Sequence, residues 1–246
     1  MVPLVQMASG PQPFDADVAE RSGYQYTTDA KLSSHLANAR ISEAVLNVTD
    51  FSNKSVIDIG CGDGTYTHEF ADRGDAARVV GVDPSREAIE VAQAASGSSS
   101  LSFECGSADT LAYEANDFDI AHLRGVLHHA DKPREAIAEA LRVAPMAIIV
   151  EPNGYNPGVK LLERASSYHR EHGERSFSAR QLDRWARESG GEVTARRWIG
   201  QVPFFCPDWF ARLAKRIEPV AEALPLVRLG MCAQYLFVAQ RRRPPT

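Results

Sequence analysis

The chain has 246 residues, of which 44% are hydrophobic and 24% are charged. This balance is typical of a globular protein with a full core and excludes the disordered and fibrous classes. A formal net charge of −5 does not provide the basic surface that binds nucleic acid non-specifically, so we expect no nucleic-acid partner. The cysteines form no C-x-x-C pair, which predicts reduced thiols in a cytoplasmic protein.

The first segments suggest neither export nor insertion into a bilayer. Residues 1–28 are rich in proline, glycine and aspartate, and we interpret them as an N-terminal arm without a secretory signal. No apolar run approaches the roughly 20 residues that span a membrane, so no integral membrane association is expected. A helix is predicted from Asp29, as its N-cap, to about Val48.

Strands and helices then alternate along the chain. The predicted strands are Ser55–Ile59, Arg78–Val82, Leu101–Glu104, Phe118–Leu123 and Met146–Val150. The predicted helices between them are Thr65–Arg73, Arg86–Ala95 and Pro133–Val143. Such alternation indicates an α/β fold with a doubly wound, mostly parallel sheet.

After Glu151 the pattern is less regular. Helices are expected over Tyr155–Ser176 and Ser178–Ser189, and strands over Glu192–Ile199 and Met231–Ala239. We predict a single domain over residues 1–246, in which 155–176 and 203–229 are helical lid or substrate-side insertions.

The central motif is D-x-G-x-G-x-G, from Asp58 to Gly64, where a buried strand turns into a helix. A Rossmann-type sheet receives a nucleotide-bearing cofactor at such a turn, because glycine allows both the turn and the close approach of a ligand. The dinucleotide spacing G-x-G-x-x-G fails, since its last position falls on Thr65 or Thr67. This argues against a nicotinamide-dependent oxidoreductase.

Asp58, the acidic residue that opens the motif, further distinguishes a dinucleotide cofactor from S-adenosylmethionine. Asp58 would place a carboxylate near a pyrophosphate, and like charges at short range are costly. It suits a cation instead. S-adenosylmethionine carries a sulfonium and an ammonium group, so Asp58 is interpreted as an anchor for its methionyl end.

The segment from Ser55 to Val150 resembles a class I methyltransferase of the methyltransferase-11-like group. The resemblance implies a Rossmann-like, seven-stranded sheet with a final antiparallel strand, S-adenosylmethionine as cofactor and S-adenosylhomocysteine as product. It also implies that Asp83, after the second strand, binds both ribose hydroxyls. The alternative is that Asp83 caps the following helix.

Further cofactor contacts follow from the same resemblance. Gly106–Tyr113 is similar to the family's G-D-A-E-x-L-P-F segment at the adenine, although Ser107 replaces the usual aspartate. Leu123–His129 resembles the family's segment after the fourth strand, with its L-H-H signature. Besides Asp58 and Asp83, the predicted cofactor-binding residues are Tyr26, Gly60, Cys61, Gly62, Gly64, Pro84, Ser107, Ala108, Asp109, Leu123 and Arg124.

Methyl transfer from a sulfonium needs positioning and exclusion of water, and a hydroxyl acceptor benefits from a general base. His128 and His129 are the candidates for that base, and local packing at a helix start is the alternative. Arg124 could also clamp an anionic substrate, or simply lie at the surface. Predicted substrate-side residues are Tyr24, Glu151, His169 and His172. We expect no metal, because His169, His172 and Glu174 lie on a charged segment typical of a solvated face and the chain offers no clear fourth ligand.

Residues 202–210 are strongly aromatic, and 211–227 continue as an amphipathic stretch. This region could wall an apolar pocket or rest on a membrane, but core packing or a homodimer contact is favoured. The leading hypothesis is a methyltransferase acting on a small molecule at oxygen. The alternatives are N- or C-methylation, or a non-catalytic S-adenosylmethionine-binding partner subunit.

Overall fold

The computed structural model describes residues 24–165, 175–204 and 206–242, and contains a seven-stranded sheet of order β3-β2-β1-β4-β5-β7-β6. The first five strands run parallel, and β7 is antiparallel to both β5 and β6. The doubly wound sheet with an antiparallel final strand is therefore confirmed. The strands are β1 (Ser55–Ile59), β2 (Arg78–Asp83), β3 (Leu101–Cys105), β4 (Ile120–Arg124), β5 (Met146–Pro152), β6 (Gly191–Ile199) and β7 (Gln234–Arg241).

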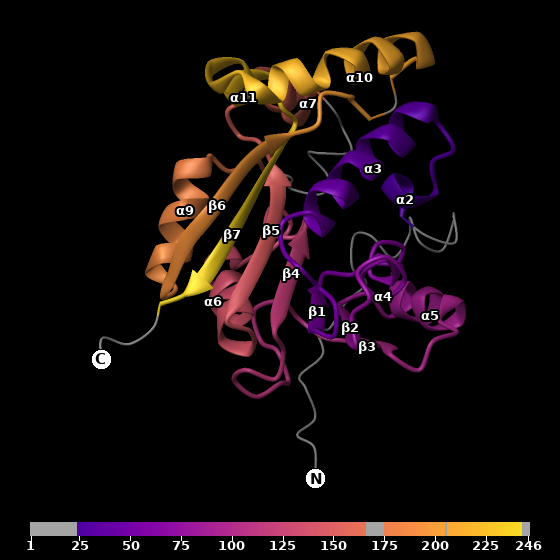
Figure 1. The fold of residues 1–246 in the computed structure, drawn as a ribbon, viewed down its shortest axis with the longest axis vertical. Coiled ribbons are helices and arrows are strands. Elements are labelled where there is room, and N and C mark those ends of the chain that lie inside the picture. The colour runs from indigo at the N-terminus through magenta and orange to yellow at the C-terminus, as the bar shows by residue number, and fades with distance from the viewer. Residues whose placement is uncertain (1–23, 166–174, 205, 243–246) are drawn as a thin grey trace.

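Helices cover both faces of the sheet (Figure 1). Apolar side chains of α3 (Leu32–Leu46), α4 (His68–Asp72) and α5 (Arg86–Ala95) pack in one core cluster on one face. Those of α6 (Pro133–Val143) and α9 (Ala179–Glu188) pack in a second cluster on the opposite face. Burial on both faces explains why the central strands read as nearly continuous apolar runs.

Three helices lie beyond the carboxyl ends of β4 and β5, at the top of Figure 1. They are α7 (Pro157–Ala165), α10 (Asp208–Ala223) and α11 (Pro225–Met231). Alanines of α10 pack against Ala37 of α3 and Val202 in a small third cluster. No helix among the described residues is both long and apolar enough to cross a membrane.

Several expected boundaries were wrong. The first long helix begins at Leu32 rather than Asp29, and Asp29 accepts a hydrogen bond from the Ser34 hydroxyl instead of capping the helix. A short helix, α2 (Gln25–Thr28), lies within the expected arm. The helix after the glycine-rich turn spans only His68–Asp72, because the residues before it continue the turn.

Candidate functional site

The glycine-rich turn between β1 and α4 holds three residues with positive φ, Gly60 at 74°, Gly62 at 57° and Gly64 at 78°. A β-carbon at these positions would lie 2.4 Å from Val126, 2.6 Å from Tyr24 and 2.7 Å from Phe103, respectively. The tight turn is thus confirmed as one reason for glycine. The second reason is close packing by protein side chains, which the sequence did not indicate.

Asp83 closes β2 beside this turn and is only 6% exposed. Its Oδ2 accepts a hydrogen bond from the Gly62 amide and its Oδ1 one from the Ser85 amide, both at 2.9 Å. The N-cap of α5 is Ser85, whose hydroxyl accepts from the Ala88 amide, so the capping alternative for Asp83 is wrong. Burial raises the pKa of the Asp83 carboxyl to about 6, and the nearby carboxylates add to the shift.

Asp58 lies in a buried polar cluster on the strand before the turn. Its Oδ2 accepts a hydrogen bond of 2.6 Å from the Thr67 hydroxyl, and its Oδ1 lies 2.7 Å from His122 Nδ1. Asp58 and His122 are paired in register across β1 and β4, and the edge of the Phe70 ring packs on the imidazole. Both Asp58 oxygens are therefore engaged by protein groups, and its role at the methionyl end stays a prediction.

Asp63, inside the glycine-rich turn, ties the N-terminal segment to the site. Its Oδ2 accepts hydrogen bonds from the Tyr24 amide, at 3.0 Å, and from the Thr27 hydroxyl. The Tyr24 ring consequently lies against Gly62, and burial raises the pKa of its phenol. The structure thus brings Tyr24 to the turn, whereas the side chain of Tyr26 lies outside the described part.

The loop after β4 is organised by Glu151, which is 0% exposed. The Glu151 carboxylate accepts hydrogen bonds from the amides of Val126 (2.9 Å), Leu127 (2.7 Å) and His128 (3.2 Å). It also lies 2.9 Å from His128 Nδ1, and the His128 and His129 rings are 3.8 Å apart. Glu151, predicted to face the substrate, thus has its carboxylate occupied in shaping the loop that carries both candidate bases.

Arg124 connects the end of β4 to α3. Its guanidinium lies 3.6 Å above the Tyr66 ring and donates hydrogen bonds to Ser42 Oγ at 3.0 Å and Asn38 Oδ1 at 2.9 Å. Burial lowers the pKa of this guanidinium. These contacts hold α3 over the end of β4. The expected contact of Arg124 with cofactor or substrate stays a prediction.

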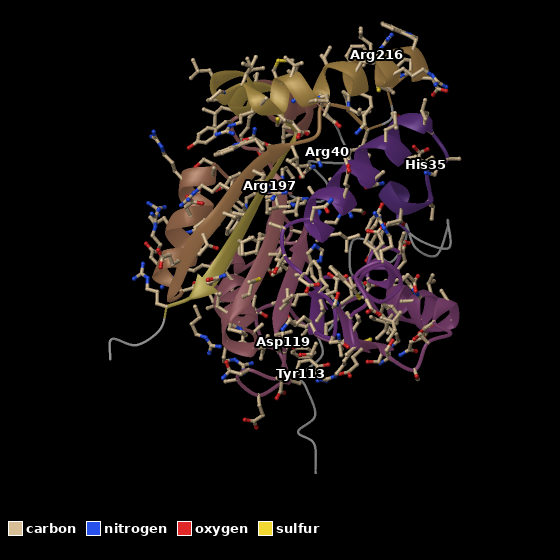
Figure 2. The ribbon with its side chains drawn as sticks, viewed as in Figure 1. His35, Arg40, Tyr113, Asp119, Arg197 and Arg216 are labelled. Atoms are coloured by element: carbon tan, nitrogen blue, oxygen red, sulfur yellow. The ribbon has the colours of Figure 1, made fainter. Side chains whose placement is uncertain are left out.

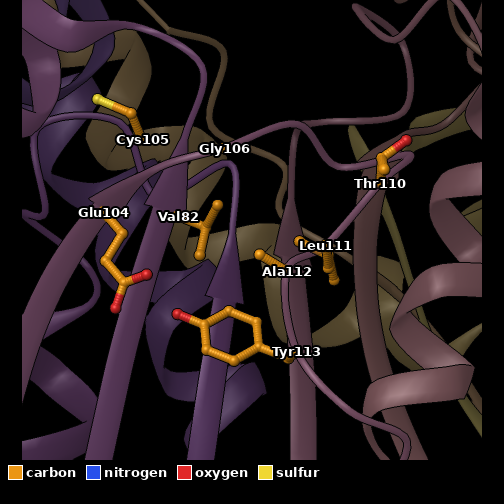
Figure 3. Close-up of a pocket in the computed structure, with 8 residues that line it drawn as sticks. All are labelled: Val82, Glu104, Cys105, Gly106, Thr110, Leu111, Ala112 and Tyr113. Atoms are coloured by element: carbon orange, nitrogen blue, oxygen red, sulfur yellow. The ribbon is translucent and has the colours of Figure 1, made fainter. Parts of the chain in front are cut away.

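The segment after β3 borders a small hollow (Figure 3). The residues that line it include Val82, Gly106, Leu111 and Ala112. Ser107 Oγ donates a 2.6 Å hydrogen bond to Asp109, and Lys132 Nζ lies 3.4 Å from the same carboxylate. These partners lower the pKa of Asp109, the Ser107 hydrogen bond contributing most.

For the other predicted site residues that the structure describes, burial and packing are the main observations. Leu123 is fully buried in the core, Pro84 is exposed, Ala108 is partly buried, and Cys61 packs against Gly81. His169 and His172 lie outside the described residues. Within the described part of the chain, no group of three or more His, Cys, Asp or Glu side chains could hold a metal ion.

Sequence reasoning missed Asp63, Thr67 and His122. An acidic residue between the glycines was the available signal for Asp63. For His122 the signal was a polar residue inside an apolar strand, but its partner could not be named without the pairing of β1 with β4.

Known proteins share this architecture. Residues 57–147 match the family model described as a methyltransferase domain. An uncharacterized methyltransferase of Schizosaccharomyces pombe is 33% identical over 109 residues, which cover 41% of this chain and 37% of that protein. The ubiquinone biosynthesis O-methyltransferase of Coxiella burnetii is 29% identical over 122 residues, covering 49% of each chain. The chain thus matches half or less of the length of these curated relatives.

Solved structures extend the likeness to nearly the whole chain. A methyltransferase in complex with the Trm112 activator of Haloferax volcanii superposes with a TM-score of 0.71 at 19% identity, covering 96% of this chain and 100% of that one. Magnesium protoporphyrin IX methyltransferase of Synechocystis, with bound S-adenosylhomocysteine, gives 0.66 at 14% identity, covering 93% and 96%. Residues 57–147 thus match a methyltransferase domain, and the described chain has the Rossmann-like fold of these methyltransferase structures.

Proposed function

We propose that this protein transfers the methyl group of S-adenosylmethionine to an oxygen atom of a small-molecule acceptor. The observation that carries the proposal is the Asp83 carboxylate, buried at the end of β2 and bonded to the glycine-rich turn. The fold receives cofactors at this edge of the sheet. The names of the Coxiella burnetii relative and of the Synechocystis structure support methyl transfer, the former at oxygen.

The Asp83 carboxylate fits the ribose of the cofactor. Each of its oxygens accepts one backbone hydrogen bond, and a carboxylate oxygen can accept two. Two adjacent ribose hydroxyls would donate to the remaining lone pairs. The hollow beside Gly106, with Val82 and Leu111 in its wall, lies next to the segment proposed to border the adenine.

The residues after β4 would serve the acceptor. When bound, S-adenosylmethionine supplies an electrophilic methyl group, and the transfer is an in-line displacement that depends mainly on positioning. Glu151 holds His128 through Nδ1, which orients the ring. If Nδ1 carries the proton, the lone pair lies on Nε2, and this atom would take the proton from an acceptor hydroxyl.

Calorimetric titration tests the cofactor. We expect S-adenosylmethionine and S-adenosylhomocysteine to bind, and Asp83→Ala to weaken both at least about tenfold, because two charge-assisted hydrogen bonds are lost. Glu87→Ala, in the exposed first turn of α5, is the matched control and should bind like the unaltered protein. Binding of NAD alone would contradict the proposal.

Turnover of labelled S-adenosylmethionine over a panel of hydroxyl and amine acceptors tests the chemistry. We expect label on hydroxyl compounds and a loss of turnover, without loss of cofactor affinity, in His128→Ala. Label found only on amines would overturn oxygen as the methylated atom. Cofactor binding without transfer to any acceptor would favour a partner subunit that does not catalyse.

A further inference from the structure

Helix α10 turns its small side chains inward and its large apolar side chains outward. Its buried apolar positions are all alanines, Ala211, Ala214 and Ala221. Trp209 is 69% exposed, Leu213 50%, Ile217 43% and Val220 62%. These four residues recur every three or four positions and therefore form one stripe along the helix. A helix that only packed on its own domain would bury this stripe.

The stripe continues onto the next helix. Leu224 is exposed at the junction, and Leu226 of α11 is 85% exposed. Figure 1 shows the two helices following one another across one end of the molecule. A groove lined by Phe210, Leu213, Ile217 and Met231 among others lies along their side. We call the residues Trp209, Leu213, Ile217, Val220, Leu224 and Leu226 the outer stripe.

On α10, the glutamates are paired on the inner side of the helix, whereas two arginines beside the outer stripe are exposed. Glu218 is buried, where it accepts from Lys215 and lies 3.7 Å from Arg40 on α3, and Glu222 pairs with the same arginine. Arg212 and Arg216, by contrast, are exposed, and the described residues provide no ion pair to either. Figure 2 shows Arg216 on α10 and Arg40 on α3. Apart from Asp208 in the first turn, the acidic side chains of α10 are thus engaged on its inner side.

We propose that the outer stripe docks on the surface of an anionic phospholipid bilayer, with Arg212 and Arg216 at the lipid phosphates. A helix lying in the plane of a bilayer has an apolar face with Trp and Leu, and arginines beside it. Tryptophan is enriched at the level of the lipid headgroups, because its apolar ring contacts the acyl chains while its N–H is hydrated. A negatively charged leaflet attracts each nearby cation by about 1 kcal/mol.

The charge pattern favours this occupant over a second copy of the chain. In a symmetric contact the same stripe would face itself, and four arginines would gather at its edges. Only the two copies of Asp208 would be exposed on α10 to compensate them. A bilayer with anionic headgroups supplies the missing negative charge along the whole edge.

Sedimentation with lipid vesicles tests the proposal on the full chain. We expect a several-fold larger bound fraction on vesicles that contain phosphatidylglycerol than on phosphatidylcholine alone, and a decrease at high salt. Trp209→Ser with Leu213→Ser should remove binding to both vesicles. Arg212→Glu with Arg216→Glu should remove the preference for the anionic lipid.

Two exposed arginines on another helix provide the matched control. Arg180→Glu with Arg187→Glu, both on α9, changes the net charge equally and should bind vesicles like the unaltered protein. Retained S-adenosylmethionine affinity shows that each variant is folded and keeps this test separate from the proposed activity. Absence of binding to anionic vesicles, or equal binding by every variant, would overturn the proposal. A dimer that the Trp209 and Leu213 substitutions dissociate, without vesicle binding, would assign the stripe to a second copy.

Discussion

At the glycine-rich edge of the sheet the buried side chains are polar and paired, whereas on α10 the exposed side chains are large and apolar. Asp58, Asp83 and Glu151 are almost fully buried, and each accepts hydrogen bonds at both oxygens. Trp209 and Val220 are mostly exposed and pack on no core cluster. The first arrangement fixes the internal geometry of the sheet edge, and the second leaves an apolar surface open to solvent.

The largest loss of stability is expected from substitution of Glu151, at the polar edge of the sheet. Glu151→Ala leaves the amides of Val126, Leu127 and His128 without an acceptor; the Leu127 amide is buried and the other two are partly buried. We expect the free energy of unfolding, measured in urea, to fall by about 3 kcal/mol, since each unsatisfied buried group costs about 1–3 kcal/mol and part of the loop can relax. Glu151→Gln keeps one acceptor and should lose less. Equal stability of Glu151→Ala and the unaltered protein would show that the carboxylate does not hold the loop.

Leu213 and Ala214, neighbours on α10, compare an exposed with a buried position on the same helix. Ala214→Leu forces a larger side chain into a position that is only 4% exposed, and should cost about 2 kcal/mol of unfolding free energy. Leu213→Ser, one residue earlier and half exposed, should change it by less than about 0.5 kcal/mol. Thermal and urea unfolding of both variants measures the difference. The reverse order of the two effects would mean that the outer stripe is part of the core.

A smaller effect is expected from pH at the polar edge. The pKa of Asp83 is raised to about 6, mainly by burial. In the proposed complex the ribose hydroxyls would donate to the ionised carboxylate. Affinity for S-adenosylmethionine should therefore be constant well above pH 6 and fall as the pH drops through that value, by about tenfold one unit below it. Calorimetry across this range measures the change. Asp83→Asn is the control and should show weaker binding with no such step; a step of the same size in Asp83→Asn would assign the titration to another group.

Much of the fold could be predicted from local patterns. The apolar runs of β1, β2 and β5 and the helical periodicity of α5 and α6 gave nearly correct bounds, because such segments are buried by any sheet that pairs them. The turn from Gly60 to Gly64 was predictable because positive φ favours glycine over every other residue. Asp83 was predicted to bind ribose from the family resemblance, and this role stays a prediction; its competing role as a cap was excluded only when Ser85 was seen in that position.

Other parts of the site depended on partners distant in the chain. Asp58 meets His122 and Glu151 meets the Val126 amide only after β1, β4 and β5 are paired. Arg124 reaches Asn38 because α3 crosses the end of β4. Contacts between residues so distant in the chain cannot be predicted from a local sequence pattern. These polar residues were therefore singled out for a ligand from the sequence, and their contacts with one another were not predicted.

The sequence by itself determined the order of strands and helices, the glycine-rich turn and the carboxylate after the second strand. These features follow from steric limits on φ and from the periodicity of apolar residues, which act within a few residues of the chain. Only the tertiary structure decided which way α10 faces. Periodicity predicts that one face of a helix is apolar, but the neighbours that bury the alanines, Ala37 of α3 and Val202, determine that the larger side chains point outward.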